Sequence, residues 1–124
     1  MVPPVLHVVV YEAEDLRGQW IAHVLDFDVM SQGNAPDHAI GMASAAAEIC
    51  VDTIRRREGA YQVAPLEEWG RFLRICRTGR VVDALGSATD VEIACLVEVG
   101  ASWSVLARWV ATVPRDPAPV AAVG

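Results

Sequence analysis

Histidines and carboxylates are the side chains of this chain whose types could do chemistry, as metal ligands or as acid–base groups. The candidates are His7, His23, His38, Asp26, Asp28 and Asp37. No His-x-His or His-Glu-x-x-His spacing joins them, and Ser31 forms a triad with His23 and Asp28 in composition only. The chain holds no nucleophile-elbow motif and no Walker sequence. We therefore expect a protein that is not an enzyme, with no catalytic residue, no bound metal and no cofactor.

The cysteines Cys50, Cys76 and Cys95 are a second group with possible chemistry. They are odd in number, widely spaced and set among apolar neighbours. A disulfide framework needs pairs, and a zinc ribbon needs closely spaced cysteines. Buried thiols are therefore the expected state of all three.

Charge placement limits the partners that the chain can bind. The net charge is −6, and residues 1–58 carry nine acidic and four basic side chains, which gives −5. Arg71, Arg74 and Arg77 form the one basic stripe at helical spacing, and we expect it to be a solvated face because Glu67 can pair with Arg71. Phosphate binding needs clustered cations, so DNA is not an expected partner, whereas a basic protein is.

The elements that would position these side chains begin with three strands. Residues 5–11 are a β-branched run, and residues 19–25 alternate with Trp20, Ala22 and Val24 on one face. Residues 29–32 form a short third strand. Gly33 closes it, since a residue without a Cβ can adopt the positive φ of a sharp turn.

Two helices are expected next. The first spans residues 35–58, with Asn34 as its N-cap, Pro36 in its first turn and Asp37 favoured by the helix dipole. Its Ala-rich face would lie on the sheet. The second spans residues 64–77. Its expected apolar face consists of Leu66, Trp69, Phe72, Leu73 and Cys76.

The last third supports two interpretations. Residues 91–99 alternate as a strand does, which would add a fourth strand. Alternatively, residues 84–113 form a helix-turn-helix around a turn at Gly100. Arg108 is the one cation that its second helix could offer to DNA, so base reading is the weaker interpretation.

Residues 20–40 resemble the core of the HicB-like antitoxin family. A Trp-bearing strand leads through Gln32 and Gly33 to a small polar residue, a proline, an acid and Ala39 at the start of a long helix. The acidic-acidic-Trp start of the second helix, at Glu67, extends the resemblance. The chain is thus similar to single-domain HicB-like proteins. Its sequence shows no clear ribbon-helix-helix or larger helix-turn-helix module of the kind that other members append to bind an operator.

The resemblance implies an α+β fold with a three- to four-stranded antiparallel sheet packed on one long helix, partly ferredoxin-like or double-stranded-RNA-binding-like, plus a second short helix. Residues 1–59 would form the β-β-β-α core. Residues 60–113 would complete the same domain, and residues 114–124 would be a flexible Pro- and Ala-rich tail. No signal peptide and no apolar run of membrane-spanning length is present, so the cytoplasm is the expected location.

The function that the resemblance implies is binding of a small basic ribonuclease toxin of the HicA kind, whose active surface the chain would cover. Such domains commonly self-associate, so a homo-oligomer is expected. The partner-binding candidates are Glu12, Glu14, Asp15, Asp26 and Asp28, and the oligomer-interface candidates are Trp103 and Trp109. Two alternatives stay open: an oligomeric adaptor without a toxin, and a transcriptional regulator that uses residues 84–113 as a helix-turn-helix.

Overall fold

The β-branched and alternating segments in the first third of the chain form three strands, as the sequence predicts. In the computed structural model, which describes residues 5–56, 62–83, 91–100 and 105–114, these are β1 (Val5–Glu12), β2 (Trp20–Val24) and β3 (Val29–Gly33). Each pairs antiparallel with the next, and the helix α1 (Pro36–Arg55) follows. The predicted β-β-β-α order is confirmed.

The sheet is larger than predicted. It has six strands in the order β3-β2-β1-β5-β6-β4, and all of its pairings are antiparallel. The added strands are β4 (Arg80–Val82), β5 (Val91–Val99) and β6 (Val105–Pro114). The α+β class is therefore correct, but a sheet of three to four strands is not.

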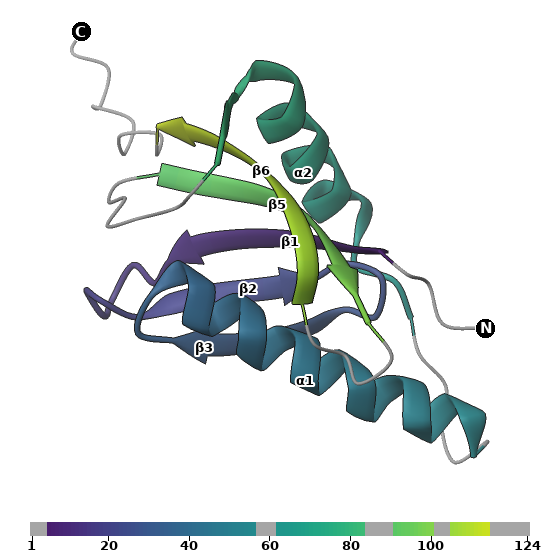
Figure 1. The fold of residues 1–124 in the computed structure, drawn as a ribbon. Coiled ribbons are helices and arrows are strands. Elements are labelled where there is room, and N and C mark those ends of the chain that lie inside the picture. Colours follow the sequence, from purple (N-terminus) through teal and green to yellow (C-terminus); the bar gives the residue numbers. More distant parts are fainter. Residues whose placement is uncertain (1–4, 57–61, 84–90, 101–104, 115–124) are drawn as a thin grey trace, which may run out of the picture.

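The helix-turn-helix interpretation of residues 84–113 is wrong in the part that the structure describes. β5 pairs with β1 and β6 pairs with β5, so both segments are strands (Figure 1). Residues such as Val110 and Thr112 suit a strand, and β5 presents a ready pairing edge, so cross-strand pairing prevails over the helical spacing of apolar residues.

The two faces of the sheet carry separate apolar layers, each covered by one helix. Trp20, Ala22 and Val24 lie in the layer under α1, as predicted, whereas Leu25 lies in the layer on the opposite face. The second helix, α2 (Leu66–Thr78), covers that opposite face (Figure 1). The long helix is thus only one of two that the sheet packs on.

The start of α1 differs from the prediction. The N-cap residue is Ala35, and no side chain caps the helix. Asn34 instead contacts His38, whose Nδ1 lies 3.1 Å from Asn34 Oδ1 and accepts the Asn34 backbone N–H. Pro36 and Asp37 occupy the first turn as expected.

The turn from β3 into α1 depends on Gly33 for a reason other than the one predicted. Among the described glycines the positive φ belongs to Gly18, at 83°. A Cβ on Gly33 would lie 2.5 Å from the backbone nitrogen of Ala39, which is far inside contact distance. Gly33 therefore permits a close approach of strand and helix.

The apolar face predicted for α2 is partly wrong. Phe72 and Ile75 are the buried residues of this helix, whereas Leu66 and Leu73 are 87% and 63% exposed. Trp69 and Cys76 pack against the same layer as predicted. Helical spacing allowed either face, and the sheet selected the one that contains Ile75.

Candidate functional site

The acidic residues predicted to bind a partner lie in two different environments. Glu14 and Asp15 are exposed in the connection between β1 and β2, at one end of the sheet (Figure 1). Glu12 is half-buried, and its Oε2 accepts the backbone N–H of Gly18 at 2.8 Å. We call Glu12, Glu14 and Asp15 the acidic tip. Glu12 holds the shape of this tip, while Glu14 and Asp15 face solvent.

Asp26 and Asp28 lie in the turn between β2 and β3, and the carboxylate of each contacts a histidine side chain. Asp26 accepts the backbone N–H of His7 at 2.7 Å, and its other oxygen lies 2.9 Å from His7 Nδ1. Asp28 Oδ1 lies 2.7 Å from Nε2 of the buried His23. The φ of Asp28 is 53°, a left-handed conformation that Asp tolerates better than most residues. Both carboxylates are therefore committed to contacts within the chain.

The arginine stripe on α2 is only partly the solvated face that we expected, because Arg74 and Arg77 are exposed whereas Arg71 is half-buried. Arg71 Nε and Arg74 Nη2 lie 3.0 and 3.2 Å from Oε2 of Glu92, a buried residue of β5. The Arg71 guanidinium also lies 4.3 Å from the ring centroid of Tyr11. Its neighbour on α2 is Glu68, with 3.8 Å between Oε2 and Nη1, and not the predicted Glu67.

Glu68 links the arginines to the histidines. Its Oε2 lies 3.8 Å from His23 Nδ1, and this buried oxygen has no hydrogen-bond partner among the described residues. His7 contacts α2 as well, because its ring centroid lies 5.3 Å from that of Trp69 and 5.5 Å from that of Phe72. Buried charges need partners, so these contacts bind α2 to the sheet through paired groups.

This cluster is not arranged as a metal site. His7 and His23 share a face of neighbouring strands, but each turns to its own aspartate. Within the described residues, no group of three or more His, Cys, Asp or Glu side chains could hold a metal ion.

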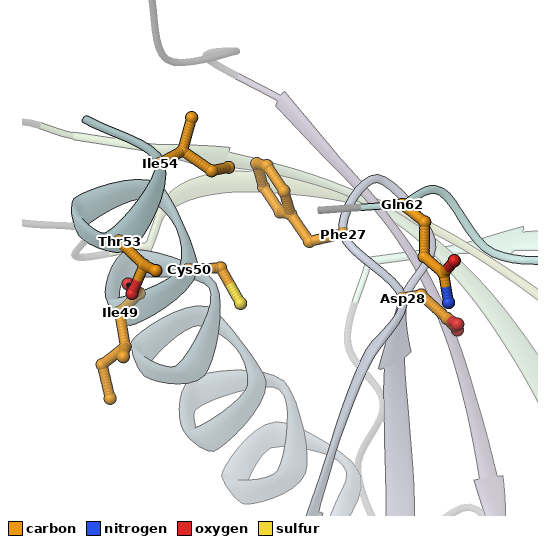
Figure 2. A pocket seen from close by; sticks show the side chains of 7 residues that line it. All are labelled: Phe27, Asp28, Ile49, Cys50, Thr53, Ile54 and Gln62. Atoms are coloured by element: carbon orange, nitrogen blue, oxygen red, sulfur yellow. Dashed lines mark hydrogen bonds between the residues drawn. The ribbon is translucent and has the colours of Figure 1, made fainter. Parts of the chain in front are cut away.

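A pocket of about 380 Å³ lies between the second half of α1 and the turn after β2 (Figure 2). It is lined by Phe27, Asp28, Ile49, Cys50, Thr53, Ile54 and Gln62. Figure 2 shows Phe27 and Cys50 pointing into the gap from opposite sides, while Asp28 and Gln62 lie on the side away from α1. Two apolar side chains thus face each other across the pocket, while two of its polar residues, Asp28 and Gln62, lie on the side away from α1.

The three cysteines differ in exposure. Cys95 is buried, and burial raises the pKa of its thiol to about 12. Cys76 and Cys50 are only half-buried, which corrects the expectation of three buried thiols; burial still raises the pKa of Cys76. Of the two predicted interface tryptophans, Trp109 is exposed on β6, and Trp103 lies outside the described residues.

The contacts that sequence reasoning missed involve Glu68 and Glu92. Glu92 is an acidic residue inside an apolar strand, and such a residue needs a buried partner. That pattern was visible in the sequence. The sequence did not show which residues pair with Glu92, because Arg71 and Arg74 are 21 and 18 positions away.

No protein-family model, no curated protein and no solved structure matches this chain. The HicB-like resemblance thus stays a prediction. Among the described residues, no helix has the length and apolarity needed to cross a bilayer.

Proposed function

We propose that this chain is a protein-binding module of the antitoxin type, which neutralises a small basic ribonuclease of the HicA kind. The mechanism is steric: the module covers the active surface of the ribonuclease so that RNA cannot enter. The observation that carries the proposal is the acidic tip, where Glu14 and Asp15 face solvent at one end of the sheet.

The fold supports the proposal. A Trp-bearing β1-β2-β3 meander leads through Gln32 and Gly33 into α1, which is the arrangement that the family resemblance implies. β5 then adds beside β1, as the expected fourth strand would.

The contacts of Asp26 and Asp28 reduce the number of acidic residues that are available to bind a partner. Asp26 and Asp28 bind His7 and His23, so they contribute to holding the domain together and not to first contact with a partner. Exposed acids on a chain of net charge −6 attract a basic protein and raise its association rate. The contact residues of this proposal are therefore Glu14 and Asp15, braced by Glu12.

The test is affinity capture of the tagged full chain from its native lysate, with partners identified by mass spectrometry. We expect a stoichiometric small basic protein that cleaves RNA alone and is inhibited by the added chain. The double substitution Glu14→Gln and Asp15→Asn should weaken its affinity roughly tenfold, about 1.4 kcal/mol, at low salt.

The matched control is Glu98→Gln. Glu98 is an exposed acid on β5, and its cross-strand neighbour Val5 lies at the end of β1 that is far from the acidic tip. This substitution should leave the affinity unchanged. Failure to capture any basic partner, or equal weakening by the control, would contradict the proposal.

A further inference from the structure

The outer side of α2 carries a regular stripe of exposed residues. Leu66, Gly70, Leu73 and Arg77 follow one another at intervals of four, three and four positions, so they share one face of the helix. All four are exposed, and Leu66 and Leu73 are 87% and 63% exposed. None of the described residues therefore covers this face. We call these four residues the outer stripe of α2.

The spacing of the outer stripe is that of the seam between two paired helices. In such a pair, a side chain of one helix inserts into a hole formed by four residues of the facing helix. Gly70, Leu73, Arg74 and Arg77 stand at the spacing of such a hole, i, i+3, i+4 and i+7. A hollow of about 430 Å³ lies there, and it is lined by these four residues and Cys76. The helix thus presents a hole that one inserted side chain could fill.

Gly70 keeps this hollow open. A Cβ on Gly70 would meet no atom of its own chain within 4 Å, so packing inside the described part of the chain does not require a glycine here. Glycine costs roughly 1 kcal/mol in a helix interior relative to alanine. An inserted side chain of a partner would give this glycine a purpose, because a larger residue would occupy the hollow itself.

The charge around the hollow indicates the kind of partner. Arg77 is exposed, and the Arg74 side chain is 45% exposed although it contacts Glu92. The acids of α2, Glu67 and Glu68, lie in its first turn, before the hollow. The partner that complements this basic rim carries carboxylates. A nucleic acid fits less well, because phosphate binding needs more clustered cations and gains little from Leu73.

We propose that an acidic, amphipathic helix of another protein docks on the outer stripe of α2. One apolar side chain of that helix enters the hollow above Gly70 and packs on Leu73. Carboxylates beside it pair with Arg74 and Arg77. This surface is separate from the acidic tip, so the inference goes beyond the proposed function: one chain binds a basic partner at the tip and an acidic helix on α2.

The test uses a fluorescein-labelled peptide of about three heptads, with leucine at positions a and d and glutamate at positions e and g. Like charges at e and g keep this probe from pairing with itself. We expect fluorescence anisotropy to show saturable binding to the full chain, with a dissociation constant below roughly 100 μM at low salt. The same peptide with lysine in place of glutamate should bind roughly tenfold more weakly.

Three variants locate the binding site. Gly70→Gln fills the hollow, Leu73→Asp removes its apolar contact and Arg77→Gln removes a cation; each should weaken peptide binding by roughly tenfold. Gly70→Gln should not lower the free energy of unfolding, because glutamine is a better helix former than glycine. Loss of binding by this variant therefore cannot be attributed to loss of the fold.

Matched controls make the same changes elsewhere. Ile49→Asp is the control for Leu73→Asp, because Ile49 is 68% exposed on α1. Arg17→Gln is the control for Arg77→Gln, because Arg17 is exposed between β1 and β2. Both controls should bind the acidic peptide as the wild type does. Absence of saturable binding, equal binding of the lysine peptide, or equal weakening by the controls overturns the proposal.

Two further outcomes would assign the outer stripe to a different occupant and so overturn the proposal. One is a fluorescein-labelled oligouridine that binds more tightly than the acidic peptide and is lost with Arg77→Gln. The other is a wild-type dimer, sized by light scattering, that Leu73→Asp converts to the single-chain mass. The double variant Glu14→Gln and Asp15→Asn should keep its affinity for the acidic peptide, so this test and capture of a basic partner are scored independently.

Discussion

Gly33 is a glycine that packing requires, and not its own backbone conformation. The sequence indicated a glycine that adopts positive φ, whereas the structure shows a glycine that lets β3 touch the first turn of α1. The nearest atoms to an added Cβ are backbone atoms of His38 and Ala39, at 2.5 to 2.9 Å. Backbone atoms cannot rotate away as a side chain can, so this contact fixes how the helix leaves the sheet.

Substitution of Gly33 by alanine should therefore lower the free energy of unfolding by about 2 kcal/mol or more, the scale of overpacking. Chemical denaturation monitored by circular dichroism measures the change. Gly70→Ala is the control, because Gly70 lies exposed in α2 with no atom within 4 Å of an added Cβ. It should raise stability by roughly 0.5–1 kcal/mol through helix propensity. A neutral Gly33→Ala would contradict the close approach.

At the scale of elements, α2 shows how a helix is oriented by its surroundings. Its apolar contacts come from Phe72 and Ile75, and its polar contacts come from Arg71 and Arg74 on Glu92. The buried carboxylate is acceptable because two guanidinium groups hold it. The apolar and the ionic contacts thus select the same face of α2.

Two adjacent residues of α2 test this orientation. Phe72→Ala should cost about 3–5 kcal/mol of unfolding free energy, because it empties a buried site. Leu73→Ala, one position later on the exposed side, should change it by less than about 0.5 kcal/mol. Urea titrations of both variants measure the difference. Similar costs at the two positions would mean that the helix is rotated relative to the structure.

For the whole molecule, the sheet is the single element shared by two apolar layers. The layer under α1 contains Ile40, and the layer under α2 contains Ile75; both side chains are buried. The strands between them contribute alternate residues to each layer, so both layers depend on the same sheet. Unfolding should be one cooperative transition.

A double-mutant cycle checks the separation of the layers. Ile40→Val and Ile75→Val should each cost roughly 0.5–1.5 kcal/mol, and their effects should add within about 0.5 kcal/mol because the sheet lies between them. The measurement is denaturant unfolding of the wild type, the two single variants and the double variant. A coupling energy clearly above that margin would refute independent layers.

The sequence by itself determined the features that depend on neighbours along the chain. The β-branched run in residues 5–11 and the alternation in residues 19–25 predicted strands, and the alternation also predicted the shared face of Trp20, Ala22 and Val24, because the side-chain period of a strand is a local property. Pro36 and Asp37 marked the start of α1 for the same reason.

Only the tertiary structure decided what depends on contacts between distant segments. Apolar spacing after residue 104 suits helix and strand alike, and β5 made it a strand by offering hydrogen-bond partners. Contacts between distant segments also determined which face of α2 is exposed and which residues pair with Glu92. They likewise placed Asp26 and Asp28 next to histidines. Each of these features depends on residues that are far apart in the chain and that the sheet brings together. No local sequence pattern predicts such contacts.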